Sequence, residues 1–179
     1  MTVRPIQNLP NPVLRRRTKR ISAMSGDLQR LIDDMIDTMR DAGGVGLAAN
    51  QVGVSQKVCV IEIPQEEGEG EGRLLVLINP DVVARRGARE LDEGCLSIPG
   101  YRGTVTRSVQ VRVRALDRNG APIRIKAVDS LLAQALEHEI DHLNGILYID
   151  HLVSRDAIWK LSEEPASEAQ EVGVGTGAD

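Results

Sequence analysis

The 179-residue sequence is poor in aromatic residues: Phe is absent, and Phe, Trp and Tyr together make up 2% of the chain. Proteins that bind single-stranded nucleic acids stack the bases on aromatic side chains, so this composition argues against that class. Apolar residues nevertheless account for 41% of the sequence. We therefore expect one globular domain with an aliphatic core, which at this length buries about 70% of the surface of the unfolded chain.

Neither sign of charge dominates, since 22 Lys and Arg stand against 26 Asp and Glu for a net charge of −4. A specific nucleic-acid partner is therefore not expected. No apolar run approaches the ~18 residues that span a bilayer, and the N-terminal segment lacks the apolar stretch of a secretory signal. These absences predict a cytoplasmic protein without membrane contact.

Cysteine is also scarce, which excludes a small fold held together by disulfides. Cys59 lies in the apolar segment KVCVIEI, where side-chain packing explains it. Cys95 lies in EGCLS, next to Gly94, and we interpret this segment as a short loop. A cysteine at such a position can present a thiolate to a metal ion.

Apolar periodicity predicts two helices. Over residues 27–42 apolar side chains recur every three or four positions, which is typical of an amphipathic helix. A second helix is expected over residues 131–144, capped by Asp129 or Ser130. Gly145 follows it, and glycine tolerates the left-handed conformation that ends many helices.

Strands are expected at 57–63 and 73–79, and alternation of apolar and polar residues predicts two more at 109–115 and 123–127. The pair Asn119-Gly120 between the last two is a strong hairpin signal.

The remaining segments are polar or rich in proline. The first ~25 residues, with three prolines and a basic run at 15–20, predict an irregular surface arm. Residues 64–72 form a charged linker. We expect residues 1–162 to be a single catalytic domain and the acidic residues 163–179 to be a disordered tail.

The most informative motif is His138-Glu139-Ile140-Asp141-His142, an H-E-x-x-H sequence on the second predicted helix. Residues four apart lie on the same face of a helix, so the two imidazoles have the spacing of metal ligands. Two histidines on an exposed helix are the alternative. We disfavour it because Leu131 and Ala135, on the same face, are apolar.

A catalytic zinc-like centre uses three protein ligands and leaves a position for water. No third histidine follows the motif at the metzincin spacing, and Cys95 is the best candidate for the third ligand. A closed structural site would need a fourth ligand, for which His151 and Cys59 are available.

A third segment, Gly44 to Gln51 (GVGLAANQ), is rich in small residues. It differs from a dinucleotide-binding fingerprint because it follows a predicted helix instead of a strand. Small residues at this density allow another chain to approach the backbone closely. Gln51 carries an amide that can stabilise an oxyanion, although a single Gln is more often an ordinary surface residue.

These three motifs, GVGLAANQ, EGCLS and HEIDH, occur in the order found in bacterial peptide deformylases, and residues 3–152 resemble that family. The resemblance implies an α+β fold with antiparallel β-sheets packed around a central helix that carries HEIDH. It also implies a metallohydrolase that removes the formyl group from the N-terminal formylmethionine of newly synthesised proteins and releases formate.

The resemblance further implies a metal centre. Cys95, His138 and His142 would hold one Fe(II) ion, which Ni, Co or Zn can replace. A metal lowers the pKa of bound water towards neutrality, and Glu139 would take the proton of that water and deliver it to the leaving amine.

The charge that develops on the formyl oxygen would be stabilised by the side-chain amide of Gln51 and the backbone N–H of Leu96. For the methionine side chain we expect an apolar pocket formed by Leu131, Ala135 and Val45. The backbone from Gly44 to Gly46 would pair with the extended substrate.

The expected partners are N-formylmethionyl nascent polypeptides. Ribosome tethering through a basic C-terminal helix is not expected, because the tail after Ser162 is acidic. The basic run at 15–20 is an alternative ribosome contact, but a solvated surface is the favoured interpretation of this run. Two other functions fit an H-E-x-x-H helix: a metallopeptidase that cleaves internal amides, and a structural metal-binding module.

Overall fold

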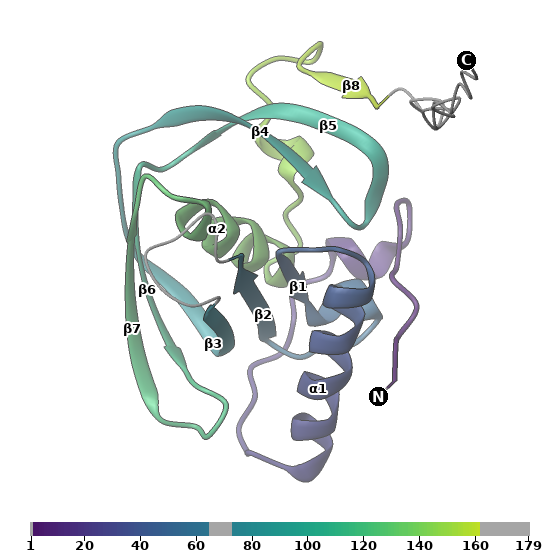
Figure 1. The fold of residues 1–179 in the computed structure, drawn as a ribbon, viewed down its shortest axis with the longest axis vertical. Coiled ribbons are helices and arrows are strands. Elements are labelled where there is room, and N and C mark those ends of the chain that lie inside the picture. Colours follow the sequence, from purple (N-terminus) through teal and green to yellow (C-terminus); the bar gives the residue numbers. More distant parts are fainter. Residues whose placement is uncertain (1, 65–72, 162–179) are drawn as a thin grey trace, which may run out of the picture.

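The computed structural model describes residues 2–64 and 73–161, so the expected acidic tail and most of the 64–72 linker lie outside the described residues. The described chain forms two antiparallel sheets and two α-helices (Figure 1). None of the described helices is long and apolar enough to cross a membrane. The fold class is α+β, as expected.

Helix α1 spans Gly26–Asp41, and its apolar stripe is buried as the periodicity predicts. The Ser25 hydroxyl accepts a hydrogen bond from the backbone N–H of Leu28 at 3.2 Å, which caps the first turn. The buried face of α1 packs on Leu47, Val58 and Val60 of the larger sheet.

The larger sheet has the strand order β1-β2-β3-β6-β7, with every neighbouring pair antiparallel. Its strands are β1 (Gly46–Ala48), β2 (Val58–Ile63), β3 (Arg73–Arg86), β6 (Gln110–Leu116) and β7 (Pro122–Val128). Strand β2 is buried on both faces, because Val58 and Val60 pack towards α1 while Cys59 and Ile61 belong to the core around α2. This double burial explains the continuous apolar run in its sequence.

The β6–β7 hairpin is present, with Arg114 opposite Arg124 in its register. Its connection runs over residues 117–121, where the N–H of Asp117 donates to the carbonyl of Ala121. Only Gly120 of the predicted Asn-Gly pair has a positive φ, at 84°.

The smaller sheet, of order β4-β5-β8, is absent from the sequence-based prediction. It consists of β4 (Arg89–Cys95), β5 (Ile98–Arg107) and β8 (Ile158–Lys160). The prediction that Cys95 lies in a loop is wrong, because Cys95 is the last residue of β4 and pairs with Ile98 across a tight turn. The strands escaped prediction because inward positions are occupied by Glu93 and Arg107 instead of apolar residues.

Helix α2 (Leu131–Leu143) lies at the centre of the molecule, between the two sheets (Figure 1). Ser130 is its cap, accepting from the N–H of Ala133 at 3.3 Å. Apolar residues of α2, including Leu136 and Ile140, pack on the larger sheet. Gly145 follows the helix with a φ of 79°.

The expectation of an irregular surface arm at the N-terminus is only partly right. Pro12–Arg15 forms a short 3-10 helix, and Leu14 within it is fully buried. The Thr18 hydroxyl donates to the carbonyl of Leu143 at the end of α2, at 2.8 Å. The arm therefore packs against the helix that carries the metal motif.

Candidate active site

Cys95, His138 and His142 present three ligand atoms that all lie within 4.8 Å of one another. Cys95 Sγ and His138 Nε2 each lie 3.2 Å from His142 Nε2. Helix α2 supplies both imidazoles from one face, and the end of β4 brings the thiol opposite them. One thiolate and two imidazoles converging in this way are a donor set for a single transition-metal ion bound at about 2.0–2.3 Å.

Glu93 fixes the orientation of the His138 ring. Its Oε2 lies 2.9 Å from His138 Nδ1, so Nδ1–H donates to the carboxylate and Nε2 keeps its lone pair for a metal. Burial opposes ionisation of Glu93, but the hydrogen bonds from His138 and Arg107 outweigh it and lower the pKa of Glu93 to about 2. Glu93 therefore stays charged beside His138, a candidate metal ligand.

A buried ion-pair network extends from Glu93. Arg107 on β5 binds both Glu93 oxygens, at 2.8 and 2.9 Å, and its third contact is Asp141 Oδ2 at 2.5 Å. Asp141 also contacts His151 Nε2 at 2.9 Å. Glu93 therefore orients His138, whereas Asp141 binds Arg107 and His151.

Glu139 lies beside the ligands with an environment suited to proton transfer. Burial raises the pKa of its carboxyl to about 7, and its Oε2 has no hydrogen-bond partner among the described residues. The backbone of Gly46 closes over the carboxylate: a Cβ at that position would lie 2.4 Å from Glu139 Oε1. A glycine is required there because no side chain fits.

Gln51 follows β1 and is buried. Its Oε1 accepts from the backbone N–H of Ala48 at 2.8 Å, which fixes the amide orientation. Nε2 then points to the metal ligands, 3.7 Å from Cys95 Sγ and 3.2 Å from Ser97 Oγ. Gln51 is therefore a positioned donor at the centre of the site.

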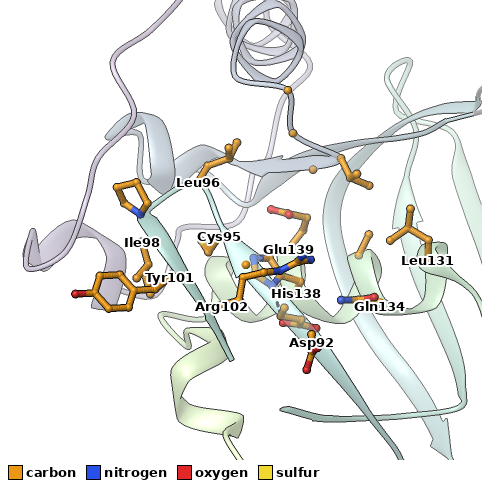
Figure 2. A pocket seen from close by; sticks show the side chains of 18 of the residues that line it. Asp92, Cys95, Leu96, Ile98, Tyr101, Arg102, Leu131, Gln134, His138 and Glu139 are labelled. Atoms are coloured by element: carbon orange, nitrogen blue, oxygen red, sulfur yellow. Dashed lines mark hydrogen bonds and ion pairs between the residues drawn. The ribbon is translucent and has the colours of Figure 1, made fainter. Parts of the chain in front are cut away.

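A cavity of about 490 Å³ is lined by Glu93, Cys95, His138 and Glu139 of this site (Figure 2). Leu131 and Gln134 lie on one side of the Cys95–His138–Glu139 cluster, whereas Ile98 and Tyr101 lie on the other. The lining includes the residues expected to bind the methionine side chain and the peptide backbone, which are Gly44, Val45, Gly46, Leu131 and Ala135. It does not include Gln51, the expected donor to the formyl oxygen. Leu96 also lines the cavity.

The two candidate fourth ligands lie elsewhere. His151 contacts Asp141, and Cys59 is fully buried in β2. Among residues 2–64 and 73–161, the cluster that meets the geometry of a metal site contains Cys95, His138 and His142 and no further ligand. Three ligands leave a coordination position for water, which is the arrangement of a catalytic centre.

Comparison with known proteins agrees with this geometry. The family model for polypeptide deformylase matches residues 3–157. This chain belongs to the polypeptide deformylase family. A peptide deformylase of Dehalococcoides mccartyi strain CBDB1 is 48% identical over 164 residues, which cover 92% of this chain and 95% of that protein.

Solved deformylase structures have the same fold. The enzyme of Legionella pneumophila is 47% identical with a TM-score of 0.78, covering 84% of this chain and 86% of that one. A deformylase of Synechococcus elongatus in complex with actinonin also has a TM-score of 0.78, at 40% identity, covering 84% of this chain and 79% of that one. The present deformylase is thus a hydrolase that acts on formylated polypeptides.

Three groups of this deformylase site were not foreseen from sequence: Glu93, Arg107 and Asn50. Glu93 stands two residues before Cys95, a spacing that puts both on the same face of a strand, and recognising β4 would have revealed it. No local sequence pattern indicated a role for Arg107. Asn50 precedes Gln51 and donates to the backbone carbonyl of His142 at 2.6 Å, which ties the glycine-rich segment to α2.

Proposed function

We propose that Cys95, His138 and His142 hold the metal of this deformylase and that Glu139 is its general base and acid. The observation that supports the assignment is the convergence of one thiol and two imidazoles beside a buried carboxylate whose pKa is about 7. When bound, the metal supplies a Lewis acid and lowers the pKa of a water molecule.

Each residue has a distinct task. Glu139 accepts a proton at pH values above its pKa of about 7 and returns it to the leaving amine. Gln51 Nε2 and the backbone N–H of Leu96 donate to the formyl oxygen as it gains charge. The rigid amide of Gln51 needs no reorientation during the reaction, because Ala48 already holds its other end.

For the substrate we propose the N-formylmethionyl end of nascent polypeptides. Its formyl group is released as formate. Leu131, Ala135 and Val45 form the apolar pocket for the methionine side chain. The backbone of Gly44 to Gly46 pairs with the extended peptide. A substrate of this kind places the enzyme in the cytoplasm. The exposed arginines between Arg15 and Arg20 are the proposed contact with the ribosome.

Fe(II) is the proposed ion, one per chain, and a Cys-His-His set also accepts Ni, Co or Zn. Elemental analysis after anaerobic purification tests the identity. The proposal predicts one iron per chain in the wild-type protein and a large loss of metal in Cys95→Ala. Iron bound equally well by that variant would contradict the ligand assignment.

The decisive experiment measures free-amine release from formyl-Met-Ala-Ser by protein reconstituted anaerobically with Fe(II). Glu139→Gln should retain the metal and lose about 10²- to 10⁴-fold in kcat. Glu62→Gln, at an exposed ion pair with Arg40, is the matched control and should retain full activity. Undiminished turnover by the metal-loaded Glu139→Gln variant would refute the assignment, and cleavage of unformylated peptides would indicate a metallopeptidase.

A further inference from the structure

The outer face of the β6–β7 hairpin carries like charges directly opposite one another. Arg114 on β6 faces Arg124 on β7, and Arg112 faces Lys126. All four side chains are exposed. Like charges at opposed positions of neighbouring strands destabilise a sheet, so this arrangement conflicts with stability unless an external anion compensates it.

Within residues 2–64 and 73–161, acidic side chains neutralise this face only in part. In the row of Arg114, β3 contributes Asp81, whose Oδ1 lies 2.6 Å from the buried Lys57 Nζ. Asp81 Oδ2 lies 3.2 Å from Arg20 and 3.6 Å from Arg114. The Asp81 carboxylate thus pairs with three cations. Within the described part of the chain, no ion pair includes Arg112, Arg124 or Lys126.

The face is hollowed where these cations meet. A cavity of about 480 Å³ is lined by Arg20, Arg114 and Arg124 together with Asn79 and Asp81. A second hollow, of about 400 Å³, shares Arg114 and Arg124 and adds Arg112, Lys126 and Val83. We define the basic face as Arg20, Arg112, Arg114, Arg124 and Lys126. Its guanidinium groups line concave surfaces of a size that admits phosphate groups.

We propose that the basic face binds the phosphate backbone of a double-stranded nucleic acid. Arginine guanidinium groups bind phosphates bidentately, and duplexes carry about one negative charge per 1.7 Å of axis. The residues of the basic face include no aromatic side chain, whereas the exposed Tyr101 and Trp159 lie on the smaller sheet. Base stacking therefore has no platform here, and recognition is of the backbone and not of sequence.

The active-site cavity and the basic face share no lining residue. Figure 1 shows why: β6 and β7 lie at the edge of the fold, and α2 with its metal motif lies on their inner side. Binding at the basic face therefore leaves the cleft open to substrate. Duplex binding at the basic face therefore does not depend on the residue roles assigned in the active site.

The test is fluorescence anisotropy of a labelled 20-base-pair RNA duplex titrated with the metal-loaded full chain. We expect Kd in the micromolar range at 50 mM salt, with log K falling linearly against log salt with a slope of about −2 to −4. Arg114→Gln combined with Arg124→Gln should weaken binding at least tenfold and reduce the slope by about 2. Arg114→Lys combined with Arg124→Lys should retain most of the affinity.

The matched control is Arg30→Gln combined with Arg155→Gln, which removes the same charge from exposed positions outside the basic face. It should bind like the wild type, and all variants should deformylate formyl-Met-Ala-Ser at the wild-type rate. Equal weakening by both pairs would overturn the proposal, because only net charge would then matter. Absence of duplex binding, or binding to phosphatidylserine vesicles in place of the duplex, would overturn it as well.

Discussion

At the scale of single residues, the surroundings of Glu139 are distinctive because a carboxyl group is buried without a full set of hydrogen bonds. Burial raises its pKa to about 7, whereas the pKa of Glu93 on β4 is lowered to about 2. The different environments of the two carboxyl groups thus give them very different pKa values. Glu139 is the one that exchanges protons near neutral pH, and Glu93 is a permanent anion that orients His138.

This difference predicts the pH dependence of catalysis. Glu139 accepts a proton only when deprotonated, so kcat/KM should fall about tenfold per pH unit below 7 and level off above it. The measurement is kcat/KM from pH 5.5 to 9. Metal content is determined at pH 5.5 and at pH 9, so that loss of metal is not mistaken for protonation of Glu139. A flat profile between pH 5.5 and 8 would contradict the assignment of Glu139 as base.

A second residue-scale prediction concerns Gln51. Gln51→Leu removes the amide donor and should lower kcat about 10²- to 10³-fold, equivalent to about 3 kcal/mol of transition-state stabilisation, with metal content unchanged. Ser97→Ala is the control, because it removes only the hydroxyl that accepts from Gln51 Nε2. It should cost less than tenfold. Similar losses in both variants would show that the amide acts only as structural support.

At the scale of elements, the two sheets meet α2 in different ways. The larger sheet packs on α2 through aliphatic side chains such as Leu136 and Ile140. The smaller sheet contacts it through ions: Arg107 of β5 binds Asp141 of α2 and Glu93 of β4. Removing one member of a buried ion network leaves the other charges unpaired, so the network is sensitive to single substitutions.

Arg107→Ala should therefore lower the free energy of unfolding by about 3–5 kcal/mol, measured by urea denaturation. Arg40→Ala, which breaks the exposed pair between α1 and β2, should lower it much less, because solvent screens that pair. A loss for Arg107→Ala no larger than for Arg40→Ala would mean that solvent or rearranged partners compensate the buried carboxylates.

The contact of β1 with α2 gives a further prediction. Gly46→Ala places a Cβ 2.4 Å from Glu139 Oε1 and must displace the carboxylate. We expect a fall in kcat of about 10²-fold, since displacements near 1 Å have effects of that size. In Gly44→Ala the new Cβ meets the end of the Leu96 side chain, which can move, and kcat should change less. A normal kcat for Gly46→Ala would contradict the close approach.

At the scale of the whole molecule, we expect metal binding and folding to be linked, because the proposed ligands on β4 and α2 come together only in the folded state. Free metal at 100 times its Kd stabilises the fold by about 2.7 kcal/mol. Chelation should thus lower Tm by about 5–10 °C in calorimetry. The variant Cys95→Ala should show little response to the chelator, and an equal response would place the stabilising metal elsewhere.

Local features of the sequence were sufficient for part of this description. The periodicity of α1, the caps of α2 and the alternation in β6 and β7 depend on neighbouring residues, and they appear in the structure where expected. The H-E-x-x-H spacing placed two imidazoles on one face of α2 for the same reason. The family motifs indicated the fold and the reaction.

Tertiary structure alone decided what lies opposite those motifs. Strands β4 and β5 bury Glu93 and Arg107, which contradicts the apolar pattern of a half-buried strand, so their pairing cannot be read from periodicity. The tautomer of His138 and the raised pKa of Glu139 depend on residues distant in sequence. Sequence by itself determined the elements and the reactive groups, because these follow from local spacing; packing determined their charge states and partners, because burial and electrostatics are properties of the folded chain.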